Sequence, residues 1–173
     1  LRTILWTVLS MRFQLIIAFV LASLLNSPFM KFRGLYKTIL MFPWAFPGYV
    51  SILLWKTGIF NSQFGLLDLW LTSMGKDAVR WLDNDVSAFI CCSIVNLWLA
   101  LPFMIMLIDG ALQSVDRSLY EDARLCGITP FQKTVNITVP MIRPIIAPAV
   151  IITIFTTFKQ FDVVYLLTQQ DGS

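Results

Sequence analysis

"YEDARLCGITPFQKTVNITVP", residues 120–140, is the most polar long stretch in a chain that is otherwise strongly apolar. Ser118 stands three residues before Glu121, which is the spacing of a capping box, and this predicts that a helix begins there. Gly127 stands where a left-handed helix terminator is needed, and Pro130 follows it as a second stop signal. The first helix is therefore expected to be about two turns long.

A second helix is predicted to follow at once. Thr129, Pro130 and Gln132 repeat the start signature as cap, first-turn proline and third-position amide, and this helix should run to the residues before Pro140. Residues 118–139 are thus predicted to form an elbow of two short helices. Capped ends and a glycine suit a docking element, but the spacing alone leaves a plain connector between two other helices equally open.

The composition of the whole chain indicates a membrane protein. Of 173 residues, 57% are hydrophobic and 13% charged, and the mean hydropathy is +0.74. A bilayer core of about 30 Å needs roughly 20 apolar residues per helix. Four stretches come close to that length, and they predict an all-α, polytopic bundle with spans over Thr3–Leu25, Leu35–Trp55, Val86–Ile108 and Ile142–Phe158.

Basic residues set the expected orientation. They gather between the first two spans and between the last two: Lys31, Arg33, Lys37, Arg117, Arg124, Lys133 and Arg143. The positive-inside rule then places residues 26–37 and 109–143 in the cytoplasm, with Asp109 solvated at the inner end of the third span. Both chain ends fall outside. Because the sequence lacks an initial methionine and stops in an unfinished loop, we expect a fragment of a longer protein.

The predicted outer loop, residues 61–85, contains the amphipathic run "FGLLDLWLTSM", which favours a short helix at the outer interface. Pro43 and Pro47 in the second span, and Pro144 and Pro148 in the fourth, predict bends inside a bundle. Arg12 lies well inside the first span beside Gln14, either as a functional charge or as one that reaches toward the interface.

The sequence argues against catalysis. It contains no histidine, no HExxH, no GxSxG and no phosphate-binding GxxxxGK[ST] loop. Cys91, Cys92 and Cys126 lack metal-like spacing and are interpreted as small packing residues, so no cofactor or metal is expected. No acidic residue falls in the middle of a predicted span, which disfavours an ion-coupled secondary transporter. A purely structural bundle remains an alternative.

Polar residues inside the spans are candidates for the wall of a substrate pathway, because they need a partner or a water-filled path. Helical spacing places one group on one face of the third span and another on one face of the fourth. The residues are Asn96, Leu99, Ala100 and Phe103, and Thr153, Thr157 and Gln160. Amides and hydroxyls beside an aromatic ring suit a neutral sugar. Ordinary packing between membrane helices is the alternative, and it is favoured for each threonine taken singly.

The elbow resembles a known cytoplasmic signature. Glu121, Asp122 and Ala123, then Gly127 after three residues, and Ile137 to Pro140 after nine more, are similar to the signature of binding-protein-dependent ATP-binding-cassette importer permeases. Asp122 stands for the usual alanine and Val139 for the usual leucine. The resemblance implies that the first short helix inserts into a groove of an ATPase subunit, with Glu121, Ala123, Gly127 and Pro140 as the ATPase-coupling residues.

The resemblance covers nearly the whole chain. "FPWAFPGYVSILLWKTGIFNSQFGLLD", "NLWLALPFMIMLIDGAL" and "FDVVYLLT" look like segments of the larger permease subunits of maltose and maltodextrin importers. The usual glycine-glycine-proline turn after the last segment is replaced by Gln169 to Gly172. The resemblance implies the middle four helices of a type I importer permease core in the cytoplasmic membrane of a bacterium or archaeon.

The same resemblance implies a function and a set of partners. The chain would be a permease subunit that moves a maltose-like sugar, with another sugar or a glycerol-phosphate type solute as the alternative. Its partners would be a second permease subunit, two ATPase copies and an extracytoplasmic solute-binding protein that docks on outer loops including residues 61–85. ATP would be hydrolysed by the ATPase subunits and not by this chain.

Overall fold

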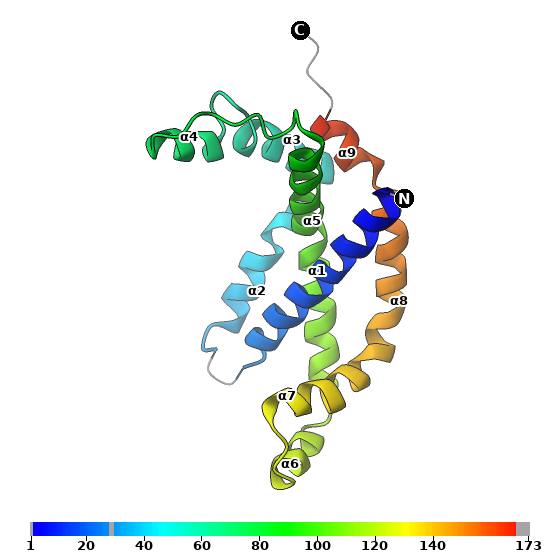
Figure 1. Ribbon diagram of the computed structural model, residues 1–173. Coiled ribbons are helices and arrows are strands. Elements are labelled where there is room, and N and C mark those ends of the chain that lie inside the picture. Colours follow the sequence, from blue (N-terminus) through cyan, green and yellow to red (C-terminus); the bar gives the residue numbers. More distant parts are fainter. Residues whose placement is uncertain (1, 28–29, 169–173) are drawn as a thin grey trace.

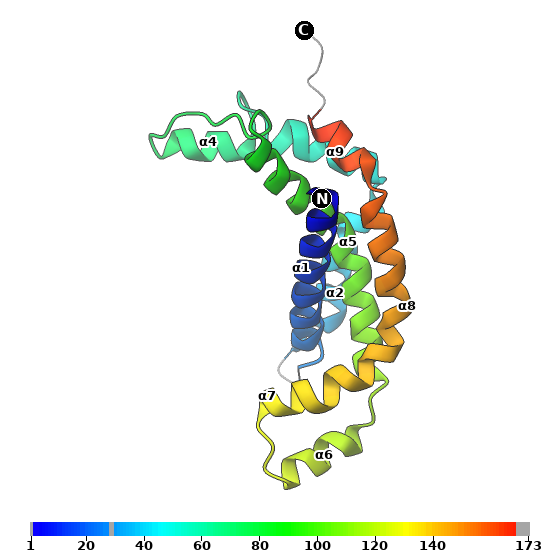
Figure 2. The same cartoon turned by 45° about the vertical axis from the view of Figure 1, so that its right-hand side comes forward.

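The computed structural model describes residues 2–27 and 30–168, and this part of the chain is helical without strands. Two long helices, α1 (Arg2–Leu25) and α5 (Asp85–Gln113), lie side by side at its centre (Figures 1 and 2). A third long helix, α8 (Val139–Phe158), packs beside them. Gln169 to Gly172, where the terminal turn departs from the family pattern, lie outside the described residues.

The apolar core lies mainly between α1 and α5. Small residues of α1, Ala18 and Ala22, are completely buried and allow close approach of the large side chains of α5. Met104 and Ile105 fill the space opposite them. Near the other end of the pair, the indole nitrogen of Trp6 donates a hydrogen bond to the hydroxyl of Ser93 over 3.1 Å. The two helices are thus fixed by packing along their length and by a polar contact near one end.

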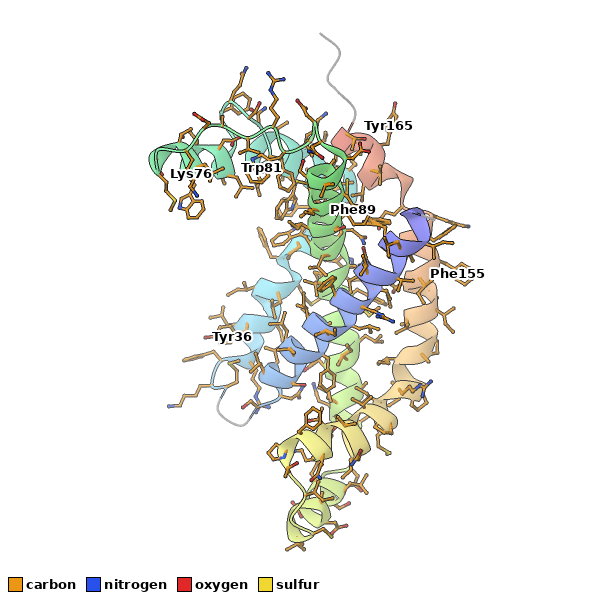
Figure 3. All side chains as sticks on the ribbon, viewed as in Figure 1. Tyr36, Lys76, Trp81, Phe89, Phe155 and Tyr165 are labelled. Atoms are coloured by element: carbon orange, nitrogen blue, oxygen red, sulfur yellow. The ribbon has the colours of Figure 1, made fainter. Side chains whose placement is uncertain are left out.

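Many large apolar side chains point away from this core. Phe155 on α8 is 63% exposed and projects outward, and Tyr36 points away from the bundle on the opposite side (Figure 3). Three helical stretches are long and apolar enough to cross a membrane: Ile4–Leu25, Asp85–Gln113 and Pro130–Thr168. An apolar exterior on helices of this length is what a bilayer accepts.

The second predicted span is not one straight helix. Residues 33–59 form α2 (Arg33–Met41), the 3-10 turn η1 (Phe42–Ala45), α3 (Gly48–Leu54) and the π turn η2 (Trp55–Ile59), with a bend of 92° between the two halves. Phe46 is extended because a residue before proline avoids helical torsions, and Pro47 caps α3. The predicted bend is confirmed, but Arg33–Ala45 is only about 20 Å long at the rise of an α-helix. The pair counts as a fourth span only if both halves belong to it.

A short helix follows this bent pair. α4 (Leu66–Ser73) lies across one end of the bundle, at the opposite end from α6 (Arg117–Leu125) and α7 (Pro130–Lys133) (Figure 1). Gly65 begins it, and a Cβ atom there would lie 2.3 Å from the carbonyl oxygen of Asn61, so only glycine fits. The amphipathic helix expected in this loop is therefore present.

Asp68 joins α4 to the return loop. Its side chain is 2% exposed, and its Oδ1 accepts a hydrogen bond from the backbone N–H of Val79 over 2.9 Å. The buried carboxylate of Asp68 thus fixes α4 to the loop at Val79, eleven residues further along the chain.

Replacing Asp68 by alanine should loosen the loop after α4, because the N–H of Val79 would lose a hydrogen bond to a charged group, which contributes about 1.5–3 kcal/mol. Hydrogen exchange at Val79 is expected to accelerate accordingly. Asp68→Asn is the matched control, since it keeps an acceptor oxygen and nearly the same shape. Equal exchange rates at Val79 in the alanine and asparagine variants would contradict this role.

Beyond the elbow, the structure differs from the sequence-based prediction. The second short helix was expected to end before Pro140, but α7 continues through the π turn η3 (Thr134–Thr138) into α8 without a break. Proline clashes with the carbonyl four residues earlier, here that of Asn136, and lacks an N–H. In the π turn just before Pro140, hydrogen bonds span five residues in place of four, and the N–H of Val139 bonds to the carbonyl of Thr134. This altered pattern accommodates the proline within a continuous helix.

Candidate functional site

The candidate site is the segment that links α5 to α8, which we call the coupling segment (residues 117–139). It lies at the end of the bundle opposite α4, with α6 and α7 stacked below the long helices (Figures 1 and 2). The first half of α2 and the loop before it lie toward the same end, and they carry Lys31, Arg33 and Lys37. The two regions that the charge distribution assigns to the cytoplasm therefore share one end of the molecule.

The turn of the coupling segment is built as predicted. Gly127 has a φ of +70°, and the N–H of Ile128 bonds to the carbonyl of Ala123 over 3.2 Å, which is the long bond of a Schellman motif. Thr129 then caps α7: its Oγ1 accepts from the N–H of Gln132, and the Gln132 side chain accepts from the N–H of Thr129. Both predicted signals, the left-handed glycine and the second capping box, are confirmed.

The start of α6 differs from the prediction. The helix begins at Arg117, so the residue before it, Asp116, takes the capping position that had been assigned to Ser118. Oδ1 of Asp116 accepts a hydrogen bond from the N–H of Ser118 over 3.0 Å. Hydrogen bonds from the backbone and the hydroxyl of Ser118 lower the pKa of Asp116, because they favour the ionised carboxylate.

This cap predicts a pH dependence of α6. Since the pKa of Asp116 is lowered in the folded chain, its contribution is fully present above the ordinary carboxyl pKa of about 4. It is lost as the pH falls through the lowered value. The protection factors of the α6 amides, which correct for the slower intrinsic exchange at low pH, should therefore fall at acidic pH. Asp116→Asn, which caps without titrating, should remove this part of the pH dependence; an unchanged pH profile in that variant would exclude the cap as its source.

A polar contact and a cation–π contact hold the two arms of the coupling segment together. Oγ1 of Thr138, in η3, donates to the hydroxyl of Tyr120, in α6, over 3.3 Å. The ammonium of Lys133 lies 4.6 Å from the centre of the Tyr120 ring. Tyr120 thus connects α6 to the start of the helix that continues as α8, and motion of α6 has a direct path into that helix.

The predicted ATPase-coupling residues occupy different environments. Glu121 is exposed and Pro140 is exposed on α8, whereas Ala123 is 5% exposed and faces its own chain. The most exposed apolar side chains of the coupling segment are instead Leu125, at 87%, and Phe131, at 77%. Leu125 and Phe131 stand on either side of the turn at Gly127, which makes the turn a candidate partner surface.

Sequence reasoning missed Leu125 and Phe131, although a signal existed. Leu125 lies two residues before the terminating glycine and Phe131 two residues after the cap, so both flank the turn. The exposed Cys126 directly follows Leu125 in the chain. Cys126 had been interpreted as a packing residue, and its exposure shows that interpretation to be wrong; Cys91 and Cys92 are buried as expected.

The predicted pathway residues lie in the bundle. Asn96 is 1% exposed, and neither side-chain atom of its amide has a hydrogen-bond partner. Thr153 and Thr157 are buried on α8, and the hydroxyl of Thr153 donates to the carbonyl of Ala149 in its own helix. Packing is therefore sufficient to explain Thr153, whereas it leaves the amide of Asn96 unexplained.

The other predicted pathway residues are less buried. Leu99 and Ala100 are half-buried, and the ring of Phe103 lies 6.1 Å from that of Trp44 in η1. Gln160 lines a cavity of about 560 Å³ at the outer end, between α1, α5 and the α8–α9 junction, where α9 is Phe161–Thr168. Their role in a pathway stays a prediction.

A polar residue of the first span joins this group. Gln14 on α1 is completely buried, and neither atom of its amide has a partner. The hydroxyl of Ser10, one turn earlier, is likewise buried and unpartnered. Arg12, by contrast, is exposed on the outside of α1. In the first span, the long buried polar side chain that lacks a partner is therefore Gln14 and not Arg12. Its position inside an apolar run could have identified it from the sequence.

Asp109 corrects another expectation. It was predicted to be solvated, but it is 3% exposed. Its carboxylate forms an ion pair with Lys37 over 2.6 Å and accepts hydrogen bonds from Asn26 and Gln113. The burial follows from the length of α5, which runs beyond the predicted end at Ile108 and carries Asp109 between α1 and α2.

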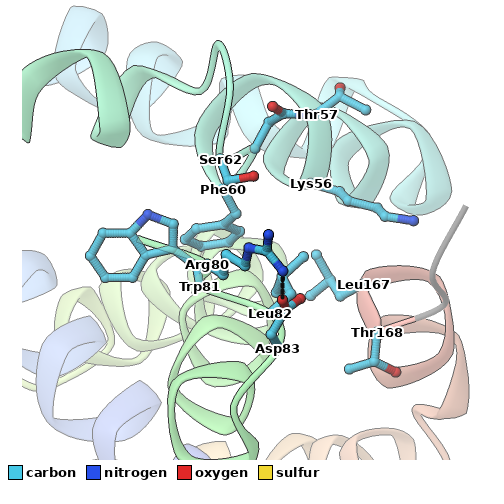
Figure 4. Close-up of a pocket in the computed structure, with 11 residues that line it drawn as sticks. Lys56, Thr57, Phe60, Ser62, Arg80, Trp81, Leu82, Asp83, Leu167 and Thr168 are labelled. Carbon is cyan, nitrogen blue, oxygen red and sulfur yellow. Dashed lines mark hydrogen bonds and ion pairs between the residues drawn. The ribbon is translucent and has the colours of Figure 1, made fainter. Parts of the chain in front are cut away.

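At the end of the bundle that carries α4, a polar cavity of about 410 Å³ opens between three segments (Figure 4). Its walls come from η2, the loop at residues 80–83 and the end of α9, and they include Lys56, Arg80 and Thr168. Arg80 pairs with Asp83 over 3.5 Å with both side chains largely exposed, so this pair contributes little to stability.

Comparison with known proteins identifies relatives over almost the full chain. Residues 14–173 match the family described as "Binding-protein-dependent transport system inner membrane component". The trehalose/maltose transport system permease protein MalF of Thermococcus litoralis is 31% identical over 96% of this chain and 56% of its own length. The galactooligosaccharides transport system permease protein GanP of Bacillus subtilis is 35% identical over 95% of this chain and 39% of its own length.

Solved structures support the same fold. A bacterial alginate ABC transporter in complex with an alginate pentasaccharide-bound periplasmic protein matches with a TM-score of 0.84 and 24% identity, over 98% of this chain and 59% of the other. An amino acid ABC transporter matches with a TM-score of 0.60 and 19% identity, over 96% and 71%. At these identities the likeness shows the fold. The chain spans about half or less of the length of the curated relatives it matches.

Proposed function

We propose a transport function because this chain belongs to the family of binding-protein-dependent transport system inner membrane components. In this proposal it is part of a permease subunit of an ATP-binding-cassette importer in the cytoplasmic membrane of a bacterium or archaeon. ATP is hydrolysed by separate subunits. This chain supplies helices of the translocation pathway and the segment that receives the ATPase.

The observation that carries the proposal is the coupling segment. It is a capped pair of helical arms at the basic end of the bundle, it exposes Leu125 and Phe131, and Tyr120 connects its first arm to the helix that becomes α8. An element of this kind can receive a partner and pass its movement to the membrane helices. Leu125 and Phe131 are the proposed contacts with that partner.

A carbohydrate is the proposed solute. Two of the relatives are named for trehalose/maltose and for galactooligosaccharide transport. Unpartnered amides of Asn96 and Gln14 within the bundle suit the hydroxyl groups of a sugar once the helices part. Another small polar solute, such as a glycerol-phosphate type compound, is the second candidate, favoured by the cations Lys56 and Arg80 at the outer cavity.

The proposed partners are a second permease subunit, two ATPase subunits and an extracytoplasmic solute-binding protein. The binding protein would dock at the outer end, on α4 and around the polar cavity of Figure 4. The movement follows a two-state scheme in which nucleotide and the loaded binding protein favour the same arrangement of the bundle.

The test is uptake by the complete transporter. The full-length protein with its native partners is reconstituted in vesicles, and ATP-dependent entry is measured for a panel of radiolabelled sugars and for glycerol phosphate. Entry of one or more oligosaccharides, only with ATP and the binding protein, is expected. Entry of glycerol phosphate alone would select the second solute class, and entry without ATP would exclude this function.

A further inference from the structure

The carboxylate of Asp109 is the best-satisfied buried charge that the structure describes in this chain. Oδ2 receives the ammonium of Lys37 at 2.6 Å and the amide of Gln113 at 2.8 Å, and Oδ1 receives the amide of Asn26 at 2.7 Å. The side chain of Asp109 is 5% exposed and that of Lys37 is 27% exposed. One carboxylate therefore joins three elements, the end of α1, the middle of α2 and the last turns of α5.

Stability alone does not account for this arrangement. An acidic residue near the carboxyl end of a helix is unfavourable to the helix dipole, and α5 ends at Gln113. A buried ion pair also loses hydration on both sides, so that an apolar pair of similar size is often at least as stable. The best-attested use of such a pair is to fix one arrangement of two elements relative to each other.

Helix α2 has few other means of being fixed. It contains no buried residue, and its apolar side chains Leu35 and Ile39 are 60% and 57% exposed. Apolar packing within the described chain therefore holds α2 weakly. The ion pair from Lys37 to Asp109 is the short, direct attachment of this helix to α5.

The attachment point is close to the coupling segment. Gln113, which bonds to Asp109, is the last residue of α5, and α6 begins four positions later at Arg117. On the other side, α2 is the first half of the bent pair, which turns by 92° toward α3 and the outer cavity. A displacement of α6 would therefore move the end of α5 and with it Asp109. The ion pair between Asp109 and Lys37 would then pass this movement to α2, the first half of the bent pair.

We propose that Asp109 is a positioning residue that links movement of the coupling segment to the bent pair α2–α3, with Lys37 as its partner. The proposal rests on the proposed transport function and adds a second route to the direct one through Tyr120 and α8. Asp109 and Lys37 contact neither solute nor nucleotide in this account. Their ion pair makes the bent pair move together with α6, so that solute passage remains coupled to ATP hydrolysis.

The experiment replaces the pair by apolar residues in the complete transporter. Asp109→Leu with Lys37→Met removes the link without leaving a buried unpaired charge, so assembly is expected to survive. Vesicle uptake and ATP hydrolysis are measured together. The inference predicts that ATPase activity stays within about twofold of the unaltered transporter, while the solute moved per ATP falls at least tenfold.

Two further variants distinguish a role of the ion pair in coupling from a role in stability alone. Asp109→Glu with Lys37→Arg keeps the ion pair and should restore most of the transport per ATP. Asp109→Asn alone keeps the side-chain shape and leaves only the partly exposed Lys37 without its ion-pair partner, so it should reproduce the uncoupling and serves as the readout if the double variant does not assemble. An unchanged ratio of solute to ATP in the variants that lack the ion pair would overturn the inference. Absence of ATP-driven uptake in the unaltered transporter would instead overturn the proposed function.

Discussion

Gly127→Val is expected to abolish coupling between the ATPase and the permease while leaving membrane insertion intact. The φ of Gly127 is +70°, a conformation that costs an ordinary L-residue about 1–2 kcal/mol and a β-branched one more. Valine would therefore open the Schellman turn and move Leu125 relative to Phe131. Uptake should fall more than tenfold, and the ATPase should be lost on purification.

Gly127→Asn is the matched control. No atom lies within 4 Å of a Cβ built at Gly127, so asparagine meets no obstacle within the chain, and it tolerates the left-handed conformation. It should keep most of the uptake. Co-purification of the valine variant with undiminished ATPase and normal uptake would contradict the role given to this turn.

Asn96→Leu should lower uptake while maintaining or raising stability. The amide of Asn96 is buried without partners, and an unpaired buried polar group costs about 1–3 kcal/mol that an apolar side chain of similar size avoids. If the amide contacts the solute after the helices part, its loss removes a hydrogen bond, which corresponds to a fall in uptake of up to about tenfold. Stability and transport would then change in opposite directions.

Thermal unfolding and sugar uptake of the complete transporter measure the two effects. Cys91→Ala is the control, since Cys91 is a buried neighbour on α5 that has no assigned polar role. It should leave uptake unchanged. If Asn96→Leu transports as well as the unaltered protein, alone and with Gln160→Ala, the proposed pathway does not include these side chains.

The sequence predicted those features that depend on a few neighbouring residues. The capping box of Thr129 and Gln132, the left-handed Gly127 and the bend at Pro47 are local, because each is set by torsions and hydrogen bonds within about five residues. The cap of α6 was placed two residues late, since Asp116 and Ser118 are both good capping residues and only the fold selects between them.

The features that sequence reasoning missed depend on distant contacts. Asp109 is buried by partners 83 and 72 positions away, Asn26 and Lys37, and spacing does not reveal which of them lies nearby. The continuous helix past Pro140 is a local exception, because the π turn at Thr134–Thr138 accommodates the proline and no residue pattern announced that turn. The exposure of Leu125 and the burial of Ala123 were missed because the orientation of α6 is set by the contact of Tyr120 with η3.

The native thiol of Cys126 offers a direct test of the proposed contact between the coupling segment and an ATPase subunit. Cys126 is exposed beside Leu125, whereas Cys91 and Cys92 are buried. In membranes containing the complete transporter, a short thiol-reactive crosslinker should join Cys126 to the nucleotide-binding subunit, and Cys126→Ser should abolish the product. Absence of that product, or labelling of Cys126 in intact cells by a reagent that cannot cross the membrane, would contradict the account.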